Sequence, residues 1–194
     1  MLLRISIFIL VSHLVLFAQN EKLVQYNQYR NKTNETAMLF LGGWAMTNIA
    51  VSSTLYGTGN ASQKYFHQMN IVWNFVNLSI AGLGWFHARK ADPHISWEKS
   101  IQAQTRIEKI LLFNAGLDVA YIMTGFYLRE RSLRSAEQGP RLKGYGHSLI
   151  LQGSFLFIFD LTAYFFQVKN PLPLPEVLTQ VYFLPYGLGI SFAF

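Results

Sequence analysis

The chain contains 194 residues, with 16 Lys and Arg against 10 Asp and Glu, which gives a formal net charge of +6. Hydrophobic residues make up 51% of the sequence, aromatic residues 15% and charged residues only 13%. A typical soluble domain is about 25% charged, so this balance excludes a disordered or collagen-like chain and does not suit an ordinary soluble domain. It predicts one domain of apolar helices placed in lipid.

The first 18 residues have the features of a secretory signal. Arg4 supplies a positive charge, residues 5–17 are apolar, and a plausible cleavage site precedes Gln19. Leu16 is larger than is usual three positions before the cut, so an uncleaved signal anchor is the alternative. Both interpretations place Gln19 outside the cytoplasm.

Residues 19–36 are polar and are expected to form an extracytoplasmic segment that begins as a short amphipathic helix. Four apolar segments follow, each close to the 20 or so residues that a helix needs to cross roughly 30 Å of hydrocarbon. The predicted transmembrane helices are 37–56, 66–87, 107–128 and 147–168. Together they predict an all-α, four-helix transmembrane bundle over residues 37–168.

Turn signals separate these segments. Residues 57–60 divide the first span from the second, Asp92-Pro93 divides the second from the third, and Gly139-Pro140 divides the third from the fourth. Ser96 is placed to cap a helix that continues into the third span.

The loop between the third and fourth spans is rich in positive charge. Its basic residues are Arg129, Arg131, Arg134, Arg141 and Lys143. Such a loop is typical of the cytoplasmic side, which agrees with an exported N-terminus. Positive residues counted over all the loops do not by themselves favour this orientation. We interpret it as a topology determinant, with anionic lipid or nucleic acid binding as the alternative. We expect membrane lipid as a partner and no nucleic acid, and favour the bacterial inner membrane over the outer one.

Polar residues recur inside three spans at helical spacing. The second span carries His67, Asn70, Asn74 and Asn77, the third carries Asn114, Asp118, Tyr121 and Gly125, and the fourth carries Gln152, Asp160, Tyr164 and Gln167. Spacings of three and four residues place each set on about one side of its helix. Hydrocarbon offers no hydrogen-bond partners, so these faces should turn inward and form a polar seam.

Depth in the membrane follows from counting residues. Asp118 falls near the midplane, and Asp160 lies roughly 5 Å nearer the outside, so the two carboxyl groups can meet. An ionised carboxylate at this depth costs about 2.5–3.5 kcal/mol, and we therefore expect at least one of them to be protonated. Asn70 should lie level with Gln152, and the pair His67 and His147 should mark the cytoplasmic edge.

The seam has three interpretations. Its residues, among them Asn74, Asn77, Asn114, Gln152 and Tyr121, can hold the helices together through bonds of about 0.6–2 kcal/mol each. They can instead form a proton, cation or small-solute pathway through Asp118 and Asp160. A metal or cofactor site is the third interpretation, but the histidines are predicted far from the aspartates, and no metal or cofactor is expected.

Enzyme signatures are lacking. The sequence contains no cysteine and therefore no cysteine nucleophile or thiolate ligand. The nucleophile-elbow, phosphate-loop and dinucleotide-binding motifs do not occur. The sequence thus favours a non-enzymatic structural or accessory subunit of the bacterial envelope, which would bind other membrane proteins or a second copy. A small transporter or channel component is the second hypothesis, and a membrane enzyme or cofactor-binding bundle is the third.

The C-terminal tail, residues 169–194, does not follow the helical pattern. A short helix can begin at Glu176 after a Pro-rich stretch, but Pro185 stops it. Beyond that point apolar residues alternate with small ones. The apolar positions are Leu188, Ile190, Phe192 and Phe194. A period of two predicts a strand-like end.

Four short stretches carry a resemblance to a known family. They are Phe17-Ala18-Gln19, Asn114-Ala115-Gly116-Leu117-Asp118-Val119-Ala120-Tyr121, Lys143-Gly144-Tyr145-Gly146 and Phe159-Asp160-Leu161. Through them, and mainly over the last three spans, the chain resembles an uncharacterised family of small helical membrane proteins of Bacteroidota-type bacteria. The resemblance implies a four-helix membrane domain and no activity.

Overall fold

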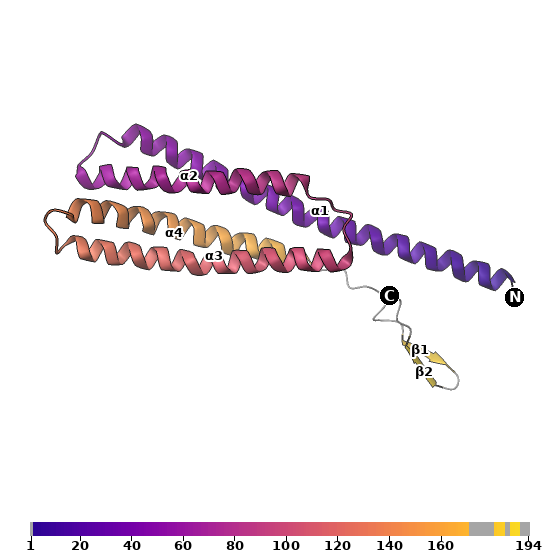
Figure 1. Cartoon of the computed structure of the whole chain (residues 1–194). Helices are drawn as coiled ribbons and strands as arrows, with labels where there is room; N and C mark the ends of the chain where they lie inside the picture. Colours follow the sequence, from indigo (N-terminus) through magenta and orange to yellow (C-terminus); the bar gives the residue numbers. More distant parts are fainter. Residues whose placement is uncertain (1, 171–180, 185–186, 191–194) are drawn as a thin grey trace.

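The computed structural model describes the backbone of residues 2–170, 181–184 and 187–190, and the side chains of residues 21–170. Its elements are α1 (Leu2–Leu55), α2 (Ala61–Lys90), α3 (Trp97–Ser132), α4 (Gly139–Val168), β1 (Val181–Leu184) and β2 (Gly187–Ile190). The four long helices run in alternating directions as a bundle (Figure 1). The predicted four-helix fold is confirmed, and each helix is longer than the span predicted within it.

α1 is one uninterrupted helix, and its N-terminal part extends past the other three helices (Figure 1). Residues 19–36, which we predicted as a separate polar segment, lie within this helix. The continuity has a simple cause, since no Gly or Pro occurs between residues 2 and 41. The signal role of residues 1–18 stays a prediction.

The starts of the next helices follow from capping. Asn60 and Gln63 form a capping box, in which Gln63 N donates to Asn60 Oδ1 at 3.0 Å and Asn60 N donates to Gln63 Oε1 at 2.8 Å. Ser96 Oγ accepts from Lys99 N at 3.4 Å, which confirms the predicted cap of α3. Gly139 and Pro140 are the first two residues of α4 and do not lie in the loop before it. Proline is well tolerated in a first helical turn.

α4 packs closely against α3 and α2 and also touches α1. Glycines permit its closest approaches. Gly144 faces the backbone of α2, a Cβ added at Gly146 would stand 2.6 Å from the Gly125 carbonyl oxygen of α3, and one added at Gly153 would stand 3.0 Å from the Asp118 carbonyl oxygen. Small residues at such crossings let helices pack closely in a membrane.

The outer surface of the bundle is apolar. Three helical segments are long and apolar enough to cross a membrane, namely Glu21–Leu55, Trp97–Ser132 and Gly139–Val168. α2 is not among them, because the polar residues on its inner face lower its hydropathy, yet it too exposes large apolar side chains. Those of α2 are Val72, Phe75, Val76, Ile80, Leu83 and Phe86. This surface fits a membrane protein.

The tail contains a short antiparallel hairpin. Val181 pairs with Ile190, and Leu184 pairs with Gly187. The short helix that the sequence allows from Glu176 is not formed at residues 181–184, where Val, Tyr and Phe favour a strand. Leu188 and Ile190 lie in β2 as their alternation predicts, whereas the predictions for residues 176–180 and 191–194 lie outside the described residues.

Candidate functional site

Gln152 of α4 is the centre of a buried hydrogen-bond network and is 0% exposed. Its Oε1 accepts from Trp44 Nε1 of α1 at 3.1 Å. Its Nε2 donates to Asn70 Oδ1 of α2 at 3.0 Å and to Asn48 Oδ1 of α1 at 3.3 Å. One side chain thus joins three helices, and Asn70 and Gln152 lie level with each other as the depth count predicts.

The network continues around Asn70. Its side-chain Oδ1 also accepts from Ser148 Oγ at 2.7 Å, and its backbone carbonyl oxygen accepts from Asn74 Nδ2 at 2.8 Å. On α1, Asn48 Nδ2 donates to the Trp44 carbonyl oxygen at 3.0 Å. Every donor and acceptor of the Gln152 side chain therefore has a partner, an arrangement that holds helices in register.

A second polar cluster joins α3 to α4. Asp118 and Asp160 are 3% and 5% exposed, and they lie close enough on the facing helices α3 and α4 to interact electrostatically. Among the described residues, no amide, hydroxyl or backbone N–H donates to Oδ2 of Asp118.

The other predicted seam residues differ in their burial and in their contacts. Asn77 is buried and its Nδ2 has no partner among the described residues, as is true of Asn74 Oδ1. Tyr121 packs edge-on against Trp73 of α2, with ring centroids 4.8 Å apart. Asn114, one turn from Asp118 on α3, is half-buried. These residues line the interior without forming a single connected network with the carboxyl pair.

The histidine pair predicted at the cytoplasmic edge is not joined by any contact in the described part of the chain. His67 and His147 are both half-buried, and Nδ1 of His67 has no hydrogen-bond partner there. Arg129 and Lys143 lie close enough to act electrostatically on His147. His147 thus lies near two cations, and no metal-ligand set is formed among the described residues.

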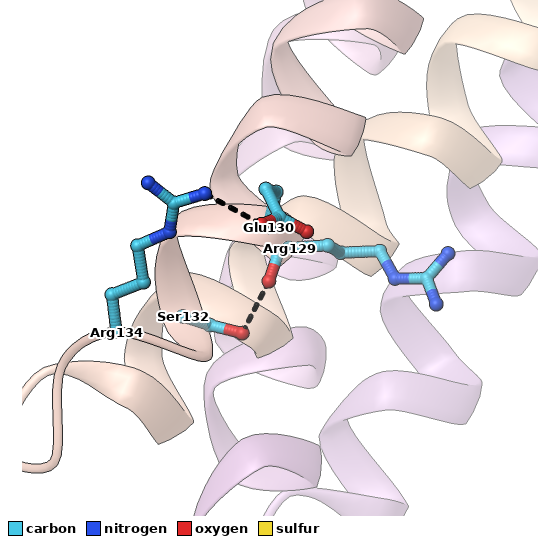
Figure 2. A network of polar contacts seen from close by, with 4 residues as sticks. All are labelled: Arg129, Glu130, Ser132 and Arg134. Atoms are coloured by element: carbon cyan, nitrogen blue, oxygen red, sulfur yellow. Dashed lines mark hydrogen bonds and ion pairs between the residues drawn. The ribbon is translucent and has the colours of Figure 1, made fainter.

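Arg129 belongs to the end of α3, where Figure 2 shows the polar contacts. Arg134 Nη2 pairs with Glu130 Oε1 at 3.0 Å, and Ser132 Oγ donates to the Arg129 carbonyl oxygen at 2.6 Å. The Arg129 side chain extends away from that ion pair (Figure 2). The Arg129 guanidinium is therefore not part of the Arg134–Glu130 ion pair.

Sequence reasoning missed a buried arginine at the opposite end. Arg30 of α1 is 3% exposed, although it belongs to residues 19–36, which the sequence predicts as a polar extracytoplasmic segment. Its Nη1 donates to Asn27 Oδ1 at 2.8 Å and to the Ser100 carbonyl oxygen of α3 at 3.3 Å. Asn27 Nδ2 in turn donates to the Pro93 carbonyl oxygen at 2.9 Å. These contacts fasten α1 to the start of α3.

Gln167 closes the same end from α4. Its side-chain Nε2 donates to Asn34 Oδ1 of α1 at 2.7 Å. Its backbone carbonyl oxygen accepts from Gln104 Nε2 of α3 at 3.3 Å. Gln104 Nε2 also donates to Glu108 Oε1 at 2.8 Å. The bundle therefore has a polar clamp at its α1–α3–α4 end, built from amide side chains, backbone carbonyl groups and Glu108 around the buried Arg30.

Comparison with known proteins identifies a family and no activity. The family model described as "Family of unknown function (DUF6992)" matches residues 40–161. The match includes most of the first predicted span, which is more of the chain than the resemblance over the last three spans indicated. No curated protein and no solved structure matches the chain. The chain therefore belongs to a family of unknown function, DUF6992.

Proposed function

We propose that the chain is a non-enzymatic, multi-pass protein of the bacterial inner membrane with a structural or accessory role. In this proposal all four helices cross the membrane, and the polar interior serves to fix their packing. Its partners are membrane lipid and either another membrane protein or a second copy of the chain.

The observation that carries the proposal is the complete pairing of Gln152. A transport pathway needs polar groups that exchange partners with a solute, whereas the Gln152 amide already bonds groups on α1 and α2. A buried polar side chain whose donors and acceptor are all paired favours one packing arrangement of the helices that it joins. The apolar exterior of α2 supports the crossing of this helix with the others.

A second candidate function is coupling to protons or cations through Asp118 and Asp160. The observation that favours it is the burial of two neighbouring carboxyl groups, together with Oδ2 of Asp118, which has no hydrogen-bond partner among the described residues. A carboxyl group inside a membrane segment is a frequent element of proton relays.

One experiment separates the two candidates. The purified full chain is reconstituted in liposomes, and proton and monovalent cation flux is measured under an imposed pH gradient, beside the double variant Asp118→Asn/Asp160→Asn. The structural proposal expects flux no greater than that of protein-free liposomes from both proteins. Flux through the wild type that disappears in the double variant would replace the structural proposal with the transport one.

A further inference from the structure

Positive charge is concentrated at the end of the bundle where α3 ends and α4 begins. Residues 129–143 contain five basic and two acidic residues. Two of the basic side chains have a partner. Arg134 Nη2 pairs with Glu130 Oε1 at 3.0 Å. The Arg141 guanidinium lies over the Tyr145 ring, 5.4 Å from its centre. In the described part of the chain, no carboxylate or aromatic ring pairs with the side chains of Arg129, Arg131 and Lys143.

Arg129 and Lys143 lie around the same histidine. Both act electrostatically on His147, and no acidic residue among those described does so. Lys143 lies one helical turn before His147 on α4. Arg129 reaches this position from α3, since a Cβ added at Gly146 would stand 3.0 Å from Arg129 Cγ. Two cations from neighbouring helices thus share one site to which the described chain brings no negative charge.

The two cations lie at the level where lipid phosphates are found. Arg129 directly follows the predicted third span, residues 107–128, and the predicted fourth span, residues 147–168, begins one turn after Lys143. The phosphate groups of a bilayer lie just outside its hydrocarbon core. Both side chains are exposed, and long basic side chains extend toward the headgroups from such positions. Membrane lipid is therefore the nearest source of an anion for this site.

A lipid bound at this site would also have an apolar surface for its acyl chains. Phe126 lies three residues before Arg129, and Leu151 lies four residues after His147. These spacings place each apolar side chain on about the same side of its helix as the polar one. Both Phe126 and Leu151 are exposed. The site thus joins a positive headgroup position to an apolar surface on the same two helices.

We propose that Arg129 and Lys143 bind cardiolipin, a phospholipid with two phosphates, and that each cation meets one phosphate. Two phosphates neutralise both cations, whereas phosphatidylglycerol brings a single negative charge and phosphatidylethanolamine brings an ammonium group that both cations repel. Basic sites between transmembrane helices recurrently bind such headgroups, and a guanidinium can pair with a phosphate through two parallel hydrogen bonds. The inference rests on the membrane placement proposed above and not on the role of the aspartate pair.

Native mass spectrometry of the detergent-purified full chain tests the proposal. The wild type and Arg129→Gln/Lys143→Gln are titrated separately with cardiolipin, phosphatidylglycerol and phosphatidylethanolamine built from the same acyl chains. Each basic residue near a membrane surface contributes about fivefold to the binding of an anionic lipid. The double variant should therefore bind cardiolipin about 25-fold and phosphatidylglycerol about fivefold more weakly than the wild type, and phosphatidylethanolamine equally well. Each lipid is compared only with itself, so the additional acyl chains of cardiolipin do not enter the comparison.

A matched control tests whether these two cations are the site. Arg131→Gln/Arg141→Gln also removes one positive charge from α3 and one from α4, and it should retain the wild-type affinity for cardiolipin. An equal loss in both double variants would mean diffuse attraction to the whole loop and would overturn the assignment. Equal losses of cardiolipin and phosphatidylglycerol binding in Arg129→Gln/Lys143→Gln would also overturn it, because a single phosphate would then suffice.

The four positions are exposed, so their replacement need not disturb the core, and helical circular dichroism verifies folding. Undiminished cardiolipin binding by folded Arg129→Gln/Lys143→Gln protein would exclude the site. Loss of selectivity alone would overturn only this inference, whereas a chain that binds none of the three lipids would overturn its membrane placement as well.

Discussion

Asp118 and Asp160 reach each other because their side chains lean in opposite directions along the membrane. Gly153 lies against the Asp118 carbonyl, so Asp160 stands about two turns further along α4. In any helix the Cα–Cβ bond tilts toward the N-terminus. Since α3 and α4 run antiparallel, each carboxyl group tilts toward the level of the other, which brings the two groups close enough to interact electrostatically.

The first prediction concerns the proton in this pair. The wild-type protein should show the infrared stretch of a protonated carboxyl group from about pH 6 to 8, because two carboxylates cannot share this buried position without a proton. The band should be absent from Asp118→Asn/Asp160→Asn and present in Asp92→Asn, which changes an exposed loop residue. A wild-type spectrum identical to that of the double variant would contradict the shared proton.

The second prediction concerns the Gln152 network. Gln152→Leu removes three hydrogen bonds at once and leaves buried groups on α1 and α2 without a partner. The free energy of unfolding in mixed micelles should fall by about 1–3 kcal/mol. Gln102→Leu, which changes an exposed side chain of α3, serves as the control and should have little effect. Equal stability of the two variants would argue against a structural role for the network.

The third prediction concerns the glycine contacts of α4. A Cβ at Gly153 would stand 3.0 Å from the Asp118 carbonyl oxygen, whereas one at Gly116 meets nothing within 4 Å. Gly153→Ala should therefore lower the thermal midpoint by forcing α3 and α4 apart. Gly116→Ala should leave it unchanged or raise it, because alanine is favoured over glycine inside helices by up to about 1 kcal/mol. If both variants raise the midpoint, the helices are not packed as closely as described.

The fourth prediction concerns Arg30. Lysine keeps the charge but has a single nitrogen, whereas Arg30 bonds Asn27 and Ser100 through Nη1 and Asn31 Oδ1 through Nη2 at 3.4 Å. Arg30→Lys should reduce the free energy of unfolding by about 1.5–3 kcal/mol, the range for hydrogen bonds to charged groups. Arg131→Lys, at an exposed position of α3, should change it little. Unfolding in urea at several protein concentrations would separate this effect from any change in association.

The fifth prediction concerns orientation. The chain contains no cysteine, so single cysteines can be introduced without a background. In intact spheroplasts a membrane-impermeant maleimide should label His94→Cys, between α2 and α3, and should label Ala136→Cys, between α3 and α4, only after permeabilisation. The reverse pattern would invert the bundle, and labelling of both sites without permeabilisation would show that α3 does not cross.

Much of the architecture follows from the sequence because membrane helices must bury their polar atoms. The spacing of Asn70 and Asn74 predicts the inner face of α2, and both residues are indeed buried. The sequence predicts the start of α3 with Ser96 as its cap, whereas α2 begins at Ala61, five residues before the predicted span, with Asn60 as its cap. These inferences need only local geometry and the absence of water in hydrocarbon.

The rest depends on which helices become neighbours. Arg30 has the composition of a solvent-exposed charge, and its burial follows only once α1 continues without a break and packs against α3. Trp44, Asn48 and Ser52 recur every four residues, a signal that could have revealed the inner face of α1. No pattern in the sequence alone shows that Gln152 would bond Trp44, since that choice depends on how α4 turns about its axis.

The polar face of α2 has a consequence for how the ribosome delivers this protein. α1 and α2 emerge first, when Asn70 has neither Ser148 nor Gln152 to bond, because both belong to α4. α2 alone lacks the hydropathy of a spanning helix, so its stable insertion must wait for the last helix to be synthesised. A nascent chain that ends after α2 would then be a substrate for membrane proteolysis, because the partners of Asn70 on α4 have not yet been made.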